Sequence, residues 1–212
     1  MKRVSVFAGV LLAALSQAQV KLSILVNGKQ TGTAVFSERL NDKGDKIVNL
    51  GITLTSNGDT ITIRSESRFN SKGEPLRKYQ ETSVKGRRGS SQTIAEFDND
   101  GANVVLITNG ERTTKHVPLK DKSSGADLSE FWLIRDAPQV GDVVTAQTFN
   151  LDKLEWQTTN TTYKGVRPLS VGGRRVTSYV TDSEKGTAFL DKDGLPLRLE
   201  LPGAVMERIW EN

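Results

Sequence analysis

Residues 48–65 read VNLGITLTSNGDTITIRS, two runs of alternating apolar and polar residues on either side of an Asn-Gly pair. Every second residue from Val48 to Leu54 is apolar, and Ile61 and Ile63 continue the pattern after the turn. A period of two predicts strands that bury one face. Asn-Gly accepts positive φ at both central positions of a tight turn. The stretch therefore predicts a β-hairpin.

The same combination of turn pairs and alternation recurs along the chain. Leucines at every second position from Leu195 to Leu201 make another apolar strand face. Together, the turn and alternation rules predict about a dozen strands joined mostly as hairpins. The turn pairs are Asn27-Gly28, Lys43-Gly44, Asn57-Gly58, Lys72-Gly73, Asp100-Gly101, Asn109-Gly110, Gly172-Gly173, Lys185-Gly186 and Asp193-Gly194.

One segment has helical spacing instead. Asp127 and Glu130 have the spacing of a capping box. The residues that then fall on one helical face are Leu128, Phe131, Trp132 and Arg135. Pro138 ends the pattern. We expect a short, largely buried helix from Asp127 to Arg135, packed on the apolar face of the sheet. The predicted fold is thus mainly all-β, an antiparallel, strongly curved sheet or incomplete barrel wrapped over one short helix.

The first residues have the organisation of an export signal. Lys2 and Arg3 precede an uncharged run from Val4 to Leu15, and small residues lead to a cleavage site after Ala18. The apolar run is shorter than the roughly 20 residues that span a bilayer. We therefore predict a signal peptide over residues 1–18 and a single β domain over 19–212. The expected location is periplasmic or secreted, in a bacterium, with no stable membrane insertion after cleavage.

Composition excludes several classes of function. The 212 residues include no cysteine and one histidine, so a disulfide framework, a thiolate zinc site and a cluster of histidine ligands within one chain are excluded. The predicted mature chain has a net charge of +2, too little for a nucleic-acid binder without a clustered basic face. We expect no cofactor, since neither a dinucleotide fingerprint nor a phosphate-binding loop occurs. The basic clusters Lys85–Arg88 and Arg174–Arg175 favour solvated turns, with contact to an acidic surface such as lipid headgroups as the alternative.

Catalytic and metal-binding patterns are weak. His116 would need a serine and an acid beside it to act as a general base, and no G-x-S-x-G elbow is present. Asp191 and Asp193 resemble the start of a calcium loop, but the first ligand position would fall on Phe189, which has no side-chain oxygen. A hairpin turn is the better interpretation. A hydrolase based on His116 or on a carboxylate pair is the third hypothesis, and our expectation is that the protein is not an enzyme.

Five stretches carry a resemblance to a family of uncharacterised bacterial envelope domains. They are DLSEFWLIRDAPQVGD at 127–142, YKG at 163–165, VGGRRVTSY at 171–179, FLDKDGLPLRLE at 189–200 and LSILVNGK at 22–29. Related domains precede secreted transglutaminase-like cores. The family in turn resembles the lipoprotein-carrier fold typified by LolA and LolB, an incomplete antiparallel barrel whose concave face is plugged by helices. The resemblance implies a cavity suited to an acyl chain or another apolar ligand, and it supplies no catalytic residues.

The few aromatic residues suggest where such a ligand would lie. We expect a binding site between the helix and the concave face of the sheet, although burial in the core is the alternative for each aromatic side chain. Trp210, in the last predicted strand, is a weaker candidate. The expected function is binding of a lipid or lipoprotein acyl chain without catalysis, and the alternative is a structural or protein-interaction module of the cell envelope without a small-molecule ligand. The predicted ligand-binding residues are Leu128, Phe131, Trp132 and Trp156.

Overall fold

The computed structural model describes residues 18–56, 58–86, 90–119 and 137–211, which form fourteen β-strands. No helix in these ranges is long and apolar enough to cross a membrane. The strands are β1 (Ala18–Val26), β2 (Lys29–Leu40), β3 (Lys46–Ser56), β4 (Asp59–Phe69), β5 (Pro75–Val84), β6 (Ser90–Phe97), β7 (Gly101–Thr108), β8 (Glu111–Pro118), β9 (Val143–Asn150), β10 (Glu155–Val171), β11 (Arg174–Ser183), β12 (Gly186–Leu190), β13 (Pro196–Leu201) and β14 (Ala204–Ile209).

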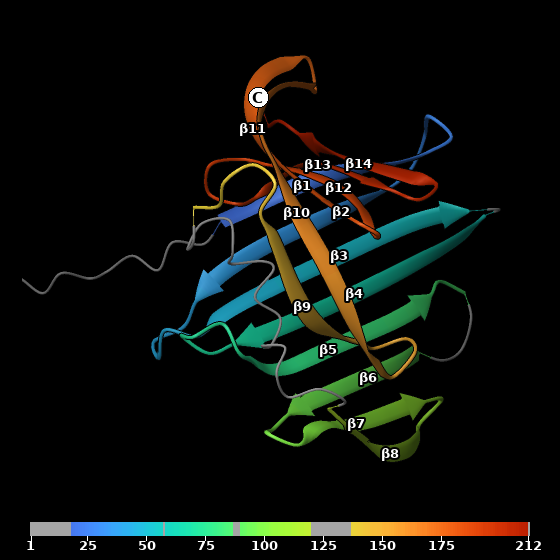
Figure 1. Ribbon diagram of the computed structural model, residues 1–212. Coiled ribbons are helices and arrows are strands. Elements are labelled where there is room, and N and C mark those ends of the chain that lie inside the picture. The colour runs from blue at the N-terminus through green and yellow to red at the C-terminus, as the bar shows by residue number, and fades with distance from the viewer. Residues whose placement is uncertain (1–17, 57, 87–89, 120–136, 212) are drawn as a thin grey trace, which may run out of the picture.

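All fourteen strands belong to one antiparallel sheet with the order β8-β7-β6-β5-β4-β3-β2-β1-β14-β13-β12-β11-β10-β9 (Figure 1). The first eight strands form a meander, and the last six form a second meander that joins it where β1 pairs with β14. The two edges, β8 and β9, are therefore consecutive strands of the chain that do not pair with each other. The sheet is not closed, and the predicted all-β, antiparallel fold is confirmed at that level.

The turns follow the chemistry of their residues. Asn27 and Gly28 both have positive φ, as do Asn109 and Gly110. That is the conformation that a two-residue hairpin loop requires, and asparagine and glycine adopt it at little cost. The predicted hairpins at these positions are therefore confirmed, joining β1 to β2 and β7 to β8.

One face of the sheet carries two buried apolar clusters. Leu50, Ile52 and Leu54 of β3 pack with a buried cluster on β1 and β2 that includes Leu22 and Ile24. The register links β3 through β4 and β5 to Ala95 on β6 and Val104 on β7, so that these residues share the same face. Ala95 and Val104 belong to a second buried cluster. This face is the inner face of the sheet.

The β9–β10 hairpin lies across the inner face. Figure 1 shows both strands crossing over the strands of the first meander, and Phe149 of β9 packs in the same buried cluster as Ala95 and Val104. At the tip of the hairpin, Gln80 of β5 donates from Nε2 to Asp152 Oδ1 at 2.7 Å. The sheet therefore curves so that the β9–β10 hairpin, near one edge, covers the inner face of β5, β6 and β7, near the other edge. The predicted helix over 127–135 falls outside the described residues and stays a prediction.

Candidate functional site

Three aromatic side chains meet where the two ends of the sheet overlap. Phe97 at the end of β6 contacts Phe149 of β9 and Trp156 of β10, with ring centroids 5.8 and 5.5 Å apart. Phe149 and Trp156 have centroids 5.2 Å apart and an interplanar angle of 71°. Such edge-to-face pairs add about 0.5–1.5 kcal/mol each beyond the area they bury. We call Phe97, Phe149 and Trp156 the aromatic cluster.

The register between β9 and β10 determines where two of the three rings of the aromatic cluster lie. Phe149 and Trp156 are cross-strand partners in the β9–β10 ladder, so that both rings point to the same side of the hairpin. Asn150 Oδ1 accepts from the backbone N–H groups of Asp152 and Lys153, both at 2.9 Å, and so shapes the turn between the two rings. The turn thus fixes the pairing that presents the rings to β6.

Further apolar side chains surround the aromatic cluster, and one hydrogen bond joins it to the edge strand β8. The Trp156 Nε1–H donates to the carbonyl oxygen of Val117 on the edge strand β8, at 3.3 Å. Phe149 is 4% exposed, whereas Trp156 is half-buried. The partly buried residues that pack against the same core are Leu106, Val117, Leu151 and Leu154.

A buried polar group stands next to the aromatic cluster. Gln147 precedes Phe149 by two positions in β9, and side chains alternate along a strand, so that it lies on the same face. Its side chain is 5% exposed, and its Oε1 has no hydrogen-bond partner among the described residues. An unsatisfied buried acceptor costs about 1–3 kcal/mol. Gln147 therefore offers a hydrogen-bond acceptor on the face that also carries the buried ring of Phe149.

The structure places one of the four predicted ligand-binding residues. Trp156 lies in the aromatic cluster, half-buried on the inner face. Leu128, Phe131 and Trp132 fall in residues 120–136, outside the described part of the chain, and remain predictions. Sequence reasoning missed Phe97, Phe149 and Gln147. A usable signal was present for Phe149, because a hairpin centred on residues 151–154 places it opposite Trp156.

His116 lies on the exposed strand β8. Its Nδ1 is 2.9 Å from Asn103 Oδ1, which can only accept, so that Nδ1 carries the proton. Asn103 Nδ2 donates in turn to Asp98 Oδ2 at 2.7 Å. Asp98 also accepts from the backbone N–H of Asp100, and this bond is the largest cause of the lowered pKa of its carboxyl group. The contacts that the structure gives His116 thus include no serine to activate.

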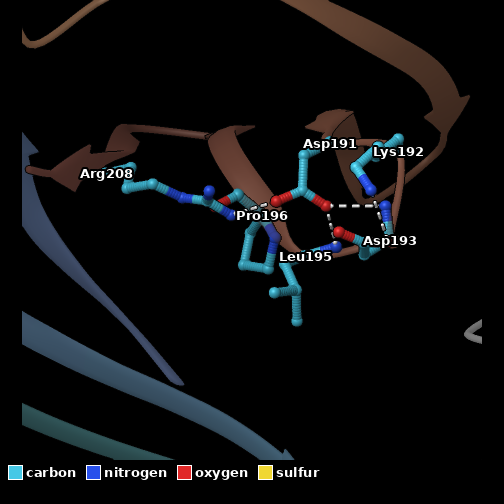
Figure 2. Close-up of polar contacts among 6 residues, drawn as sticks. All are labelled: Asp191, Lys192, Asp193, Leu195, Pro196 and Arg208. Atoms are coloured by element: carbon cyan, nitrogen blue, oxygen red, sulfur yellow. Dashed lines mark hydrogen bonds and ion pairs between the residues drawn. The ribbon is translucent and has the colours of Figure 1, made fainter. Parts of the chain in front are cut away.

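The Asp-rich sequence at 191–194 forms the turn between β12 and β13. Asp191 Oδ1 accepts from the backbone N–H groups of Asp193 and Leu195 at 3.0 and 2.9 Å (Figure 2). Its Oδ2 accepts from Arg208 Nη2 at 2.9 Å, and Arg208 Nε donates to the carbonyl oxygen of Pro196. The carboxylate is thus fully engaged in a turn and an ion pair. Within the described residues, no group of three His, Asp or Glu side chains could hold a metal ion.

Two other hairpins use the same turn. Asn41 Oδ1 accepts from the N–H groups of Lys43 and Asp45, and Asn70 Oδ1 accepts from those of Lys72 and Glu74, at 2.9–3.0 Å. In both, a glycine with positive φ stands in the fourth position, as in the turn at Asp191. The shared pattern is therefore a structural turn, in which the side chain of the first residue caps backbone N–H groups in addition to the backbone hydrogen bonds of the turn.

Two surface hollows flank β14 away from the aromatic cluster. One, of about 360 Å³, is lined in part by Lys21, Arg208 and Trp210. The other, of about 430 Å³, lies by the turn between β13 and β14 and is lined in part by Leu25 and Val205. The ring of Trp210 in the first hollow already has two cationic partners, because the guanidinium carbons of Arg174 and Arg208 lie 5.0 and 5.3 Å from its centroid.

Comparisons with known proteins bear on the fold. No protein-family model matches the chain, and no curated protein matches it in sequence. The chain is similar to the solved structure of a β-barrel-like protein of the domain of unknown function DUF1849 from Brucella abortus, with a TM-score of 0.60 and 9% identity over 91% of this chain and 94% of that one. A DUF1089 family protein from Pseudomonas aeruginosa aligns with a TM-score of 0.38 and 13% identity, over 95% of this chain and 97% of that one. The first likeness establishes the shared fold alone: an uncharacterised, β-barrel-like architecture.

Proposed function

We propose that this protein is an exported, non-catalytic domain that binds an apolar ligand, a lipid or a lipoprotein acyl chain. The ligand lies against the inner face of the open sheet, at the aromatic cluster. The carrier-like resemblance of the sequence is the reason to expect an acyl chain. Fold does not determine function, so the proposal rests on the site.

The observation that carries the proposal is how the two open edges of the sheet are held together. β8 and β9 form the two open edges, and side-chain packing joins them instead of a β-ladder. Among the described residues, the polar links across the junction are single hydrogen bonds, Trp156 to Val117 and Gln80 to Asp152. A ligand that packs against the aromatic cluster therefore widens the junction without breaking any strand pairing.

Gln147 adds a second reason. Ligand sites are mostly apolar, with a few polar groups that orient the ligand. Buried polar atoms without partners are rare in folded proteins, and each needs an explanation. A hydroxyl or amide of a bound lipid would satisfy Oε1 of Gln147, beside the ring of Phe149.

The test is a titration of residues 19–212 with a dansyl-labelled undecanoic acid, followed by dansyl fluorescence. The site variant is Phe97→Leu and the matched control is Phe189→Leu. Both phenylalanines are half-buried, but the strand pairing of Phe189 with Arg198 places it on the outer face of the sheet. Leucine offers the ligand less apolar area than the phenyl ring, a loss of about 1 kcal/mol that predicts about fivefold weaker binding for Phe97→Leu. We expect Phe189→Leu to bind as the wild type does, provided that both variants stay folded by circular dichroism.

Two results would reject the proposal. One is the absence of saturable binding to the wild type. The other is equal weakening by Phe97→Leu and Phe189→Leu, because that would trace the effect to stability rather than to the site.

A protein-interaction module is the second candidate, and the two open sheet edges favour it, since an exposed edge can accept a partner strand. β8, however, carries Arg112 and Lys115 and ends at Pro118. Charged residues and proline are devices that protect edges from pairing. Binding of an apolar ligand is therefore the function that the geometry supports best.

A further inference from the structure

The β10–β11 hairpin extends beyond the rest of the sheet. β9 pairs with β10 only up to Thr162, whereas β10 continues to Val171 before it turns into β11. Figure 1 shows the hairpin projecting at the opposite end of the molecule from β8. In this projecting part, the side of β10 away from β11 is an open edge within the described chain.

The projecting part of the hairpin is basic. Residues 164–181 contain four cationic residues and no carboxylate, in a chain with 29 Lys and Arg and 25 Asp and Glu. Lys164 is 4.0 Å from Asp182 at the base of the hairpin, and Arg174 stacks on Trp210. Arg167 and Arg175 are exposed, and within the described residues neither has a carboxylate partner. Positive charge is therefore concentrated and uncompensated here.

Exposed apolar side chains lie at the base of the same edge. Val140, Val143 and Val166 are 73%, 57% and 55% exposed. Val140 lies against the bulge in β10, because a Cβ on Gly165 would lie 2.9 Å from Val140 Cγ2. Val143 begins the neighbouring strand, opposite Thr162. Alternation along β10 and β11 puts Val166 and Arg175 on one face of the hairpin and Arg167 on the other, so exposed basic side chains lie on both faces.

The hairpin is held firmly at its tip. Trp210 Nε1 donates to the carbonyl oxygen of Val171 at 2.9 Å, and Arg174 and Arg208 lie over the indole ring. Ser178 is fully buried and donates from Oγ to the carbonyl oxygen of Arg167 at 2.8 Å. The projecting charges are therefore presented on a fixed support, at little further entropic cost on binding.

We propose that the β10–β11 hairpin is a contact element for an anionic lipid surface. Each Lys or Arg near such a surface contributes about 1 kcal/mol, or about fivefold in partitioning. The exposed valines add apolar contact at the level of the headgroups. This docking is separate from the proposed ligand site, because it uses neither the aromatic cluster nor Gln147.

The experiment measures co-sedimentation of residues 19–212 with vesicles of phosphatidylethanolamine and phosphatidylglycerol. This range contains every residue of the fourteen strands except Ala18. The variant R167Q/R175Q removes two charges without touching the Trp210 stack. The matched control R112Q/K115Q removes two exposed charges from β8, at the other end of the molecule. We expect about 25-fold weaker partitioning for R167Q/R175Q, and wild-type partitioning for the control.

Salt and lipid composition complete the test. The wild type should dissociate when the ionic strength rises from about 0.01 M to about 1 M, which shortens the Debye length from about 30 to about 3 Å. It should also bind phosphatidylcholine vesicles far more weakly. Equal binding to both kinds of vesicle, no binding to either, or equal loss in the two variants would overturn the proposal. If R167Q/R175Q still binds the dansyl-labelled undecanoic acid, a change in its vesicle binding is due to the hairpin and not to the proposed ligand site.

Discussion

The indole Nε1–H of Trp210 donates a 2.9 Å hydrogen bond to the carbonyl oxygen of Val171, 39 residues earlier in the chain. The bond joins the end of β14 to the tip of the β10–β11 hairpin. The same indole ring receives the guanidinium groups of Arg174 and Arg208. Arg208 also forms an ion pair with Asp191, and both of these side chains are largely buried. One aromatic side chain therefore ties together three hairpins at this end of the sheet.

Replacing Trp210 with Phe tests this link. Phe keeps a ring for the two arginines but removes the donor to Val171. We expect a loss of about 1 kcal/mol in the free energy of unfolding, the usual net value of one hydrogen bond. Amide exchange at Gly173 and Arg174 should accelerate more than exchange in β3. Equal acceleration throughout the sheet would mean that the hydrogen bond does not act on the hairpin tip.

The two glycines of that tip offer a matched comparison. Both have positive φ, and so alanine costs about 1–2 kcal/mol at either position. At Gly172, however, a Cβ would lie 2.6 Å from Trp210 Cδ1, whereas at Gly173 it would meet no atom within 4 Å. We therefore expect Gly172→Ala to be clearly more destabilising than Gly173→Ala in urea unfolding. Similar values for the two would show that Trp210 does not pack against the turn.

The turn at Asp191 should be more sensitive than its counterpart at Asn70. Asp191→Ala removes the turn acceptor and leaves Arg208 unpaired, with its side chain 10% exposed. We expect a loss of about 3 kcal/mol for Asp191→Ala, and of about 1 kcal/mol for Asn70→Ala, which removes a solvent-facing version of the same turn. Asp191→Asn, which keeps the Oδ1 acceptor, should fall between them. Chemical denaturation of the three variants measures this order, and equal losses would contradict it.

Asp98 predicts a specific dependence on pH. The backbone N–H of Asp100, followed by Asn103 and Gly101, lowers the pKa of Asp98 below its ordinary value of 3.8. Because the folded-state pKa is the lower one, the stabilisation is present above pH 3.8 and is lost as the pH falls through the folded pKa. Carboxyl NMR should give a midpoint below 3.8 for Asp98. A midpoint at or above 3.8 would show that the turn does not hold the charged form.

Local patterns in the sequence predict the strands well because their causes are local. Alternation from Val48 to Leu54 and the Asn-Gly turns specify hairpins through side-chain period and backbone φ. They do not specify which strands become edges. The pairing of β1 with β14 links residues about as far apart as the chain allows, and no local signal encodes it.

The candidate site is predicted only in part for the same reason. Trp156 stands out in a polar strand, but its partner Phe97 comes from another hairpin and meets it only because the sheet bends over itself. Likewise, the sequence at 191–194 predicts a turn, whereas the role of Arg208 depends on the register of β13 and β14. Contacts across the sheet are set by its curvature and register, which the alternation of residues does not reveal.

Native mass spectrometry most directly tests the central claim that the open sheet holds an apolar ligand. The full chain is expressed in a bacterium, purified without detergent, and weighed before and after denaturation. We expect an adduct of lipid or fatty-acid mass that is lost on unfolding, and weaker retention of this adduct in Phe97→Leu than in Phe189→Leu. A bare polypeptide mass for the wild type, unchanged after incubation with fatty acids, would contradict it.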